Sequence, residues 1–144
     1  MVVNEGSCPL GLWHVHVVWS GDVVMQVCFL RTPAAERAPR AFIRYCAGET
    51  DALREFRTPA TDGDTVYARI YRVVQAIPAG QTRSYGEVAA MVGTSPRVVG
   101  NAMRSNPTPL VVPCHRVVAK GGIGGFSPSV DLKRALLALE GVRV

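Results

Sequence analysis

The sequence predicts a mixed α/β (α+β) fold, in which a small N-terminal sheet lobe is followed by a helical lobe with a helix-turn-helix. Two β-branched and aromatic runs, residues 12–19 and 23–30, flank Ser20-Gly21-Asp22 in a pattern typical of a hairpin. Beyond residue 64, apolar residues recur at helical spacing and capping residues precede each run. A composition break at residues 58–64 separates the two parts, so we expect an N-terminal α/β lobe over residues 1–60 and a C-terminal domain over residues 61–144.

The remaining elements follow from local signals. In the N-terminal part, short helices are predicted around residues 41–46 and 51–56. In the C-terminal part, Ser84 with Glu87 has the form of a capping box, and Ser95 followed by Pro96 begins the next helix. The predicted helices of this part cover residues 66–77, 85–92, 96–105 and 130–139. The short link between the second and third of them predicts the helix-turn-helix.

The helix over residues 96–105 combines basic and small residues. Arg97 and Arg104 could contact a polyanion, while Gly100 and Ala102 would let the helix backbone approach a DNA groove closely. The alternative is that Gly100 and Ala102 only permit tight packing inside the protein. The residues of this stretch favour neither reading over the other.

Composition and charge limit the possible classes of protein. The chain of 144 residues has no apolar run near the roughly 20 residues that a membrane span needs, and its N-terminus lacks a signal-peptide pattern. We therefore expect a cytoplasmic, nucleoid or nuclear protein that is neither secreted nor bound to a membrane. Residues 1–60 carry six Arg against six acidic residues, whereas residues 61–144 carry ten Lys or Arg against five. The positive excess thus lies in the second part, as expected for a surface that faces nucleic acid.

The cysteines and histidines do not form a metal-binding pattern. Cys8, Cys28, Cys46 and Cys114 include no C-x-x-C pair, and the three histidines have no zinc-type spacing with them. We therefore predict no metal and no cofactor. A disulfide among the first three cysteines is possible, but the sequence does not decide it.

The stretch Pro113-Cys114-His115 suggests a cysteine nucleophile with a histidine base. Neighbouring residues of an extended segment point to opposite sides, so the two side chains would need a turn or a bridging water. A carboxylate would have to fix the tautomer of His115. Glu140 is the natural candidate, because an anion in the last turn of a helix opposes the helix dipole and calls for a partner. The pattern alone also fits a buried strand that contains a cysteine by chance.

Several ordered motifs resemble the O6-alkylguanine-DNA alkyltransferase family. PCHRVV is preceded by NP-x-P-x-x-x and followed by G-x-x-G-G-[FY]-S, and K-x-x-L-L-x-x-E-G lies downstream. IPAGQTRSYGEVAAMVG and RVVGNAMRSNP resemble the helix-turn-helix of the same family. The resemblance covers residues 65–141, more than half of the chain. It implies a ribonuclease-H-like N-terminal lobe, a C-terminal DNA-binding and alkyl-acceptor domain, and a monomer that acts on double-stranded DNA bearing O6-alkylguanine.

The resemblance also implies a role for each matching residue. Cys114 is expected to accept the alkyl group irreversibly, with His115 as its base through a water and Glu140 behind the histidine. Tyr85 would contact the flipped nucleotide, and Arg97 would fill the space that the base leaves. The same comparison places Asn106 in the active site, Val117 and Ser127 at the guanine through their backbones, and Phe126 in the pocket.

One segment departs from the family pattern, and two other functions compete with the main one. Residues Phe126-Ser127-Pro128-Ser129 stand where many relatives have a tyrosine followed by Ser-Gly-Gly, so the loop loses a hydroxyl and gains a proline. A non-catalytic helix-turn-helix protein that senses alkylated DNA is the first alternative. A cysteine hydrolase is the second, although its cysteine and histidine usually come from separate segments.

Overall fold

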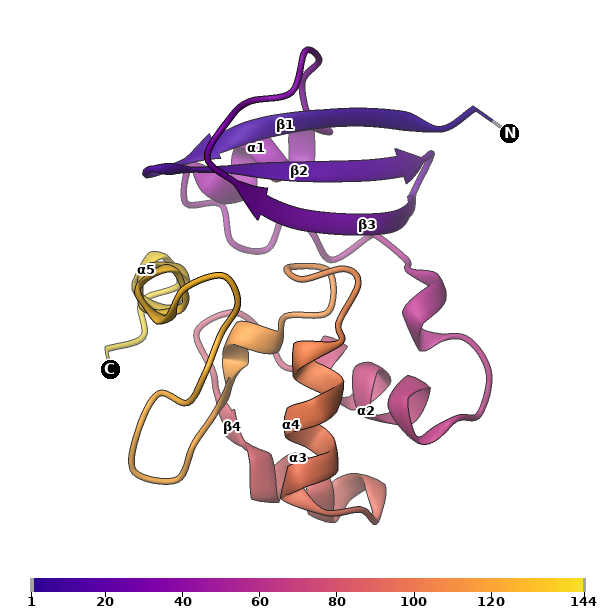
Figure 1. Cartoon of the computed structure of the whole chain (residues 1–144), viewed down its shortest axis with the longest axis vertical. Helices are drawn as coiled ribbons and strands as arrows, with labels where there is room; N and C mark the ends of the chain where they lie inside the picture. Colours follow the sequence, from indigo (N-terminus) through magenta and orange to yellow (C-terminus); the bar gives the residue numbers. More distant parts are fainter. Residues whose placement is uncertain (1, 144) are drawn as a thin grey trace. The chain divides into compact units, whose positions relative to one another are not determined.

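The computed structural model describes residues 2–143, which form two compact units. The first comprises the residues up to Pro59 together with Pro107–Val111, and the second comprises Ala60–Asn106 and the residues from Val112 onward (Figure 1). The junction at Pro59 and Ala60 lies beside the predicted boundary, but the assignment of functions to the two ranges stays a prediction. Among the described residues, no helix is long and apolar enough to cross a membrane.

The first unit is a three-stranded antiparallel sheet with one helix. Its strands β1 (Asn4–Leu10), β2 (Trp13–Ser20) and β3 (Val23–Leu30) lie in sequence order, and helix α1 (Arg40–Cys46) contacts β1. The predicted hairpin of β2 and β3 and the helix around residues 41–46 are confirmed. Strand β1 was not predicted, because Gly6 and Pro9 lower its β-propensity.

Two features of this unit lie outside the simple sheet. Glu36–Ala38 pairs in parallel with β1 at Ser7, and a Cβ on Gly6 would lie 2.1 Å from the Arg37 carbonyl oxygen, so only glycine fits there. The predicted helix over residues 51–56 is wrong, because this segment forms successive turns with hydrogen bonds between residues three apart. The segment is instead fixed by the buried Leu53 and by Phe56, whose ring centroid lies 5.4 Å from that of Phe42.

The second unit contains four helices and a two-stranded parallel pairing. The helices are α2 (Val66–Gln75), α3 (Tyr85–Val92), α4 (Pro96–Arg104) and α5 (Val130–Leu139), and β4 (Arg83–Ser84) pairs with β5 (Val117–Val118). The predicted capping box of Ser84 and Glu87 and the cap of Ser95 are both present. Gly93 ends α3 with a φ of 84°, a left-handed conformation that suits glycine and turns the chain into α4. The predicted α/β fold with its helix-turn-helix is therefore confirmed.

The core of the second unit holds the helix-turn-helix against β5. Its buried members come from α2, α3, α4 and β5 and include Ile70, Val74, Val88, Val99 and Val117. The Tyr71 hydroxyl donates a 2.8 Å hydrogen bond to the Ala102 carbonyl and so anchors α4 through a polar contact as well. This packing holds α3, α4 and β5 together around one core.

Candidate active site

A tight turn, and not a strand, presents the Cys-His-Arg sequence. Pro113 has φ −78° and ψ 71°, the conformation of an inverse γ-turn, and the Cys114 amide donates a 2.7 Å hydrogen bond to the Val112 carbonyl across it. Cys114–Arg116 then forms one turn of 3₁₀ helix before β5 begins. The expectation of an extended segment up to His115 is therefore wrong, because the proline conformation bends the chain one residue before the cysteine. The turn sends the side chains of Cys114, His115 and Arg116 in three different directions.

Cys114 is a buried thiol with several groups that favour its thiolate. Burial raises the pKa of Cys114, and a hydrogen bond from the Asn106 side chain, the nearby Lys133 cation and the backbone amides of Cys114 and His115 act in the opposite direction. Asn106 also donates a 2.8 Å hydrogen bond to the Val112 carbonyl, so its amide is held in place. Because burial is the largest effect, the resting thiol keeps its proton and needs a base to react.

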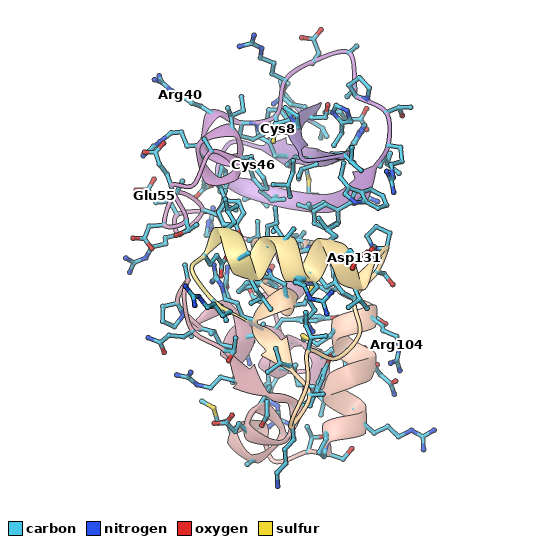
Figure 2. All side chains as sticks on the ribbon, turned by 90° about the vertical axis from the view of Figure 1, so that its left-hand side faces the viewer. Cys8, Arg40, Cys46, Glu55, Arg104 and Asp131 are labelled. Carbon is cyan, nitrogen blue, oxygen red and sulfur yellow. The ribbon has the colours of Figure 1, made fainter. Side chains whose placement is uncertain are left out.

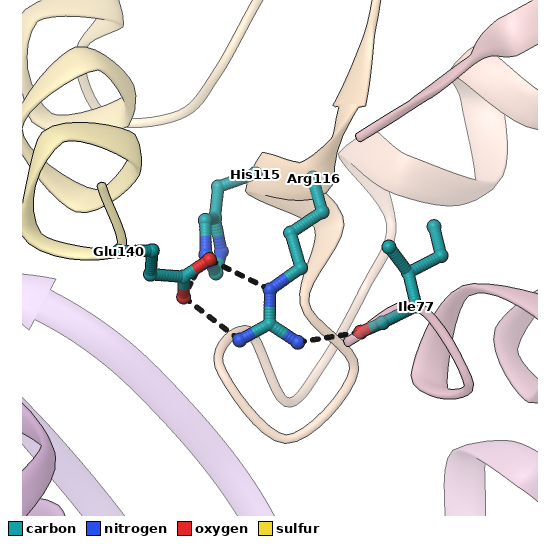
Figure 3. A network of polar contacts seen from close by, with 4 residues as sticks. All are labelled: Ile77, His115, Arg116 and Glu140. Carbon is teal, nitrogen blue, oxygen red and sulfur yellow. Dashed lines mark hydrogen bonds and ion pairs between the residues drawn. The ribbon is translucent and has the colours of Figure 1, made fainter. Parts of the chain in front are cut away.

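His115 and Arg116 converge on Glu140, as Figure 3 shows. His115 Nε2 lies 2.8 Å from Glu140 Oε2, and Arg116 binds the same carboxylate through Nε and Nη2, both at 2.8 Å. Arg116 Nη1 also donates to the Ile77 carbonyl at 2.7 Å. The side chains of His115 and Glu140 are fully buried. This bidentate geometry is the strongest form of an Arg–carboxylate pair, and it fixes the carboxylate behind the imidazole.

The contacts of His115 determine its tautomer. Burial lowers the pKa of His115 more than Glu140 raises it, so the imidazole is neutral at pH 7. An ionised carboxylate only accepts hydrogen bonds, so the proton of the neutral ring lies on Nε2 and the lone pair lies on Nδ1. Nδ1 is buried and has no hydrogen-bond partner among residues 2–143. The arrangement therefore leaves one buried basic nitrogen available, which is what a general base requires.

Glu140 is the C-cap of α5, the position where its charge opposes the helix dipole. The partner predicted for Glu140 includes Arg116, which donates two hydrogen bonds to the carboxylate. The sequence did not suggest this role for Arg116. The prediction that Glu140 stands behind His115 agrees with the 2.8 Å contact. The roles of these residues in a reaction stay predictions.

Lys133 is a site residue that sequence reasoning missed. It is fully buried, and its Nζ donates to the Val117 carbonyl at 2.7 Å and to the Gly125 carbonyl at 3.1 Å. Burial lowers its pKa to about 8. Lys133 thereby joins β5 to the glycine-rich loop of residues 121–125. It also places a positive charge near Cys114.

The buried ammonium of Lys133 should give the protein an unusual pH dependence. The pKa of Lys133 is about 8 in the folded protein and 10.5 when the side chain is exposed. Between these pH values the unfolded state therefore binds more protons than the folded state. The free energy of unfolding of the wild type should therefore gain up to about 3 kcal/mol relative to Lys133→Met as pH rises from 8 to 10.5. Urea titrations at several pH values measure this difference. The exposed Lys120→Met variant should show no such trend, and a parallel response of both variants would contradict the prediction.

Tyr85 and the glycine-rich loop form another wall of the site. Tyr85 begins α3, and its ring lies 5.8 Å from Lys133 Nζ. Burial raises the pKa of Tyr85, against a hydrogen bond from the Gly125 backbone. Phe126 is half-buried and Ser127, which precedes Pro128 in a cis peptide, is exposed. The structure thus brings Tyr85 and the loop together. The segment that differs from the family pattern, residues 126–129, follows this loop and is partly exposed.

Gly124 is the point where this loop touches Tyr85. It has a φ of 78°, and a Cβ there would lie 2.9 Å from the Tyr85 hydroxyl oxygen. Gly124→Ala should therefore destabilise the protein by about 1–3 kcal/mol, because the left-handed backbone and the contact both oppose a side chain. Thermal unfolding measures the effect. Gly122→Ala is the matched control, since nothing lies within 4 Å of its Cβ position, and equal effects of the two changes would contradict this interpretation.

The outer face of α4 carries the predicted DNA-binding residues, with one exception. Arg97 and Arg104 are exposed, and Gly100, which lies on the same stripe of the helix, has open space where a Cβ would be. Figure 2 shows Arg104 projecting from the helix into solvent. Ala102 is fully buried in the core, so it supports internal packing and not contact with DNA. Its backbone carbonyl accepts the hydrogen bond from the Tyr71 hydroxyl on the same buried side.

Comparisons with known proteins agree with this architecture. Residues 65–142 match the family described as "6-O-methylguanine DNA methyltransferase, DNA binding domain". A methylated-DNA–protein-cysteine methyltransferase of Saccharolobus islandicus is 52% identical over 75 residues, which are 52% of this chain and 50% of that protein. The chain thus spans about half the length of that curated relative.

Solved structures extend the similarity beyond the matched domain. The Mycobacterium tuberculosis protein OGT in complex with DNA is 26% identical with a TM-score of 0.74, and the match covers 95% of this chain and 92% of that one. S. pombe Atl1, in complex with damaged DNA containing O6-carboxymethylguanine, is 34% identical with a TM-score of 0.50 over 57% of this chain and 81% of that one. Because the family match covers more than half of its residues, the chain belongs to the family of the 6-O-methylguanine DNA methyltransferase DNA-binding domain.

Proposed function

We propose that the protein repairs DNA by accepting the alkyl group of O6-alkylguanine on Cys114, once per molecule, and that it acts as a monomer on duplex DNA. The observation that carries the proposal is the buried chain of contacts from Arg116 through Glu140 to His115, one residue from a buried thiol. The names of the relatives support the same activity, since they are methylated-DNA–protein-cysteine methyltransferases. The DNA complexes of OGT and Atl1 support DNA as the partner.

DNA would bind to the outer face of α4. An alkyl carbon on guanine O6 is shielded inside the duplex, so the nucleotide has to be flipped out, at a cost of a few kcal/mol. Arg97 lies exposed at the start of α4 and would fill the gap in the stack, and Arg104 would contact the phosphates. Gly100 leaves room for close approach of the backbone.

The flipped base would then lie against Tyr85 and the loop. The carbonyls of Cys114 and Val117 can accept from the exocyclic amine of guanine, and the amide of Ser127 can donate to O6. The Val117 carbonyl already accepts from Lys133, but a carbonyl oxygen has a second lone pair for the ligand. Lys133 thus positions the carbonyl that recognises the base.

The chemical step would be a single displacement. His115 Nδ1 takes the Cys114 proton through a bridging water, a role that suits a buried nitrogen with a free lone pair. The thiolate attacks the alkyl carbon, the S–C bond forms and the C–O6 bond breaks. The electron pair goes to the guanine ring, where donors near O6 stabilise it. The imidazolium that forms faces Glu140, which Arg116 holds in place. The product thioether is stable to water, so the protein does not turn over.

Mass spectrometry tests the proposal directly. After incubation with excess duplex containing O6-methylguanine, the protein should gain one methyl group in place of one hydrogen, and peptide mapping should locate it on Cys114. One equivalent of lesion should be lost per protein molecule. The Cys114→Ala variant should bind the same duplex and remain unmodified. Lesion binding by the wild type with an unmodified Cys114 would instead identify a non-catalytic sensor and overturn the proposal.

A further inference from the structure

Two cysteines of the first unit lie in contact, apart from the reactive one. Cys8 on β1 is 2% exposed, and Cys46 is the last residue of α1 and is half-buried. Their sulfur atoms are 3.8 Å apart (Figure 2). A disulfide bond joins sulfur atoms at about 2.0 Å, so small side-chain rotations can close the remaining distance. The proposed repair reaction uses neither residue.

The sheet register excludes Cys28 as a partner of Cys8. Cys8 pairs with Val15 across β1 and β2, and Val15 pairs with Phe29 on β3, so these three side chains share one face. Cys28 precedes Phe29 and therefore points to the opposite face. It also lies two strands away from β1, about 9–10 Å in strand spacing, which is beyond the reach of a disulfide. Of the cysteines in the first unit, only Cys46 can be bridged to Cys8.

We propose that Cys8 and Cys46 form an intramolecular disulfide that ties β1 to α1 when the protein meets a small-molecule disulfide. The half-buried Cys46 loses its proton and attacks the small disulfide, which releases one thiolate and leaves a mixed disulfide. Cys8 then loses its proton and attacks the Cys46 sulfur, which releases the second thiolate. The two protein thiols are oxidised, and one small disulfide is reduced to two thiols.

The environment of the pair favours the second step. In the reduced pair the hydrogen bond with Cys8, together with burial, raises the pKa of Cys46, so the first step should be the slow one and should speed up as pH rises. The mixed disulfide has no thiol proton on Cys46, so this hydrogen bond is absent from the second step, which the short distance between the two sulfur atoms favours instead. Cys8 is already in contact with the Cys46 sulfur that it attacks. Formation of the intramolecular bond should therefore be faster than reaction of Cys8 with a second small disulfide. The bond would close a loop of about 40 residues, and this constraint on the unfolded chain should stabilise the first unit.

Oxidised glutathione serves as the probe in the first experiment, with the full chain. The oxidised wild type should lose two hydrogens of mass, and peptide mapping after alkylation should find Cys8 and Cys46 joined. Cys28→Ser should form the same bond. Cys46→Ser should not form it. Separate alkylation of Cys8 and Cys46, or a lasting mixed disulfide in the wild type, would overturn the proposal.

Thermal unfolding tests the stabilising role of the bond. Oxidation should raise the melting temperature of the wild type and of Cys28→Ser by about 5–12 °C, and a reducing agent should reverse the change. The melting temperature of Cys46→Ser should not respond. An unchanged melting temperature in protein that contains the bond would overturn this role. Methyl transfer to Cys114 is measured in parallel, and its retention in oxidised protein separates this proposal from the repair function.

Discussion

Replacement of Glu140 by glutamine is expected to reduce the free energy of unfolding by about 3–5 kcal/mol. Arg116 is 8% exposed and donates hydrogen bonds to this carboxylate from two guanidinium nitrogens. A neutral amide keeps the shape of the side chain but leaves the guanidinium buried without a counter-charge. It also places an NH₂ group against donors that previously met oxygen. Urea denaturation of the wild type and the variant measures the loss.

The same helix offers a matched control. Asp131 pairs with Arg134 at 3.2 Å, but the side chains are 94% and 51% exposed. Asp131→Asn makes the same chemical change in an exposed pair and should cost less than about 1 kcal/mol. Addition of Arg116→Met to Glu140→Gln should recover part of the loss, because it removes the uncompensated charge. Similar losses for Glu140→Gln and Asp131→Asn would show that burial of the pair does not matter.

Local signals predicted the helices of the second unit well, because each signal is a short-range interaction. The capping box of Ser84 and Glu87 closes within one helical turn, and so does the cap of Ser95. Glu140 was also identified locally, as an anion in an unfavourable position of its helix. The sequence could therefore indicate that Glu140 needs a partner, and the need of His115 for a carboxylate suggested that the two residues meet.

The features that the sequence did not predict depend on tertiary packing. The sequence did not single out Lys133 as a site residue, because charged residues of a helix usually face solvent. The structure buries it, since the Val117 and Gly125 carbonyls satisfy its ammonium group. The apolar pattern of this helix would also place Ala135 on the inner face, but Ala135 is exposed and Leu137 is fully buried. The inner face of α5 is thus rotated toward Lys133, and only the facing carbonyls explain why.

The sequence could not decide for the turn at Cys114 for a related reason. Pro113 allows both an extended conformation and an inverse γ-turn, which differ mainly in ψ. The choice depends on where Arg116 must lie to reach Glu140 and the Ile77 carbonyl. Those partners are 24 and 39 residues away in sequence, so no window around the cysteine contains them.

The catalytic consequence of that turn is best tested at His115. His115→Gln should slow alkyl transfer by about 100- to 10,000-fold at pH 7, because the buried thiol then lacks its base. The amide can still donate to Glu140, so the fold and the affinity for lesion DNA should be retained. Single-turnover transfer of methyl from an O6-methylguanine duplex measures the rate. His14→Gln, in the first unit, is the control and should react like the wild type.

The pH profile separates loss of a base from simple loss of structure. Burial lowers the pKa of His115 from its ordinary value of 6.5, so the wild-type rate should stay constant down to below that pH. Without the imidazole, transfer depends on the small fraction of Cys114 that is ionised, and burial raises the pKa of that thiol above its ordinary value of 9.0. The rate of His115→Gln should therefore rise about tenfold per pH unit between pH 6.5 and 7.5, where Lys133 keeps its charge and the wild-type rate does not change. A variant that is slow but independent of pH would place the defect in the geometry of the site and not in proton removal.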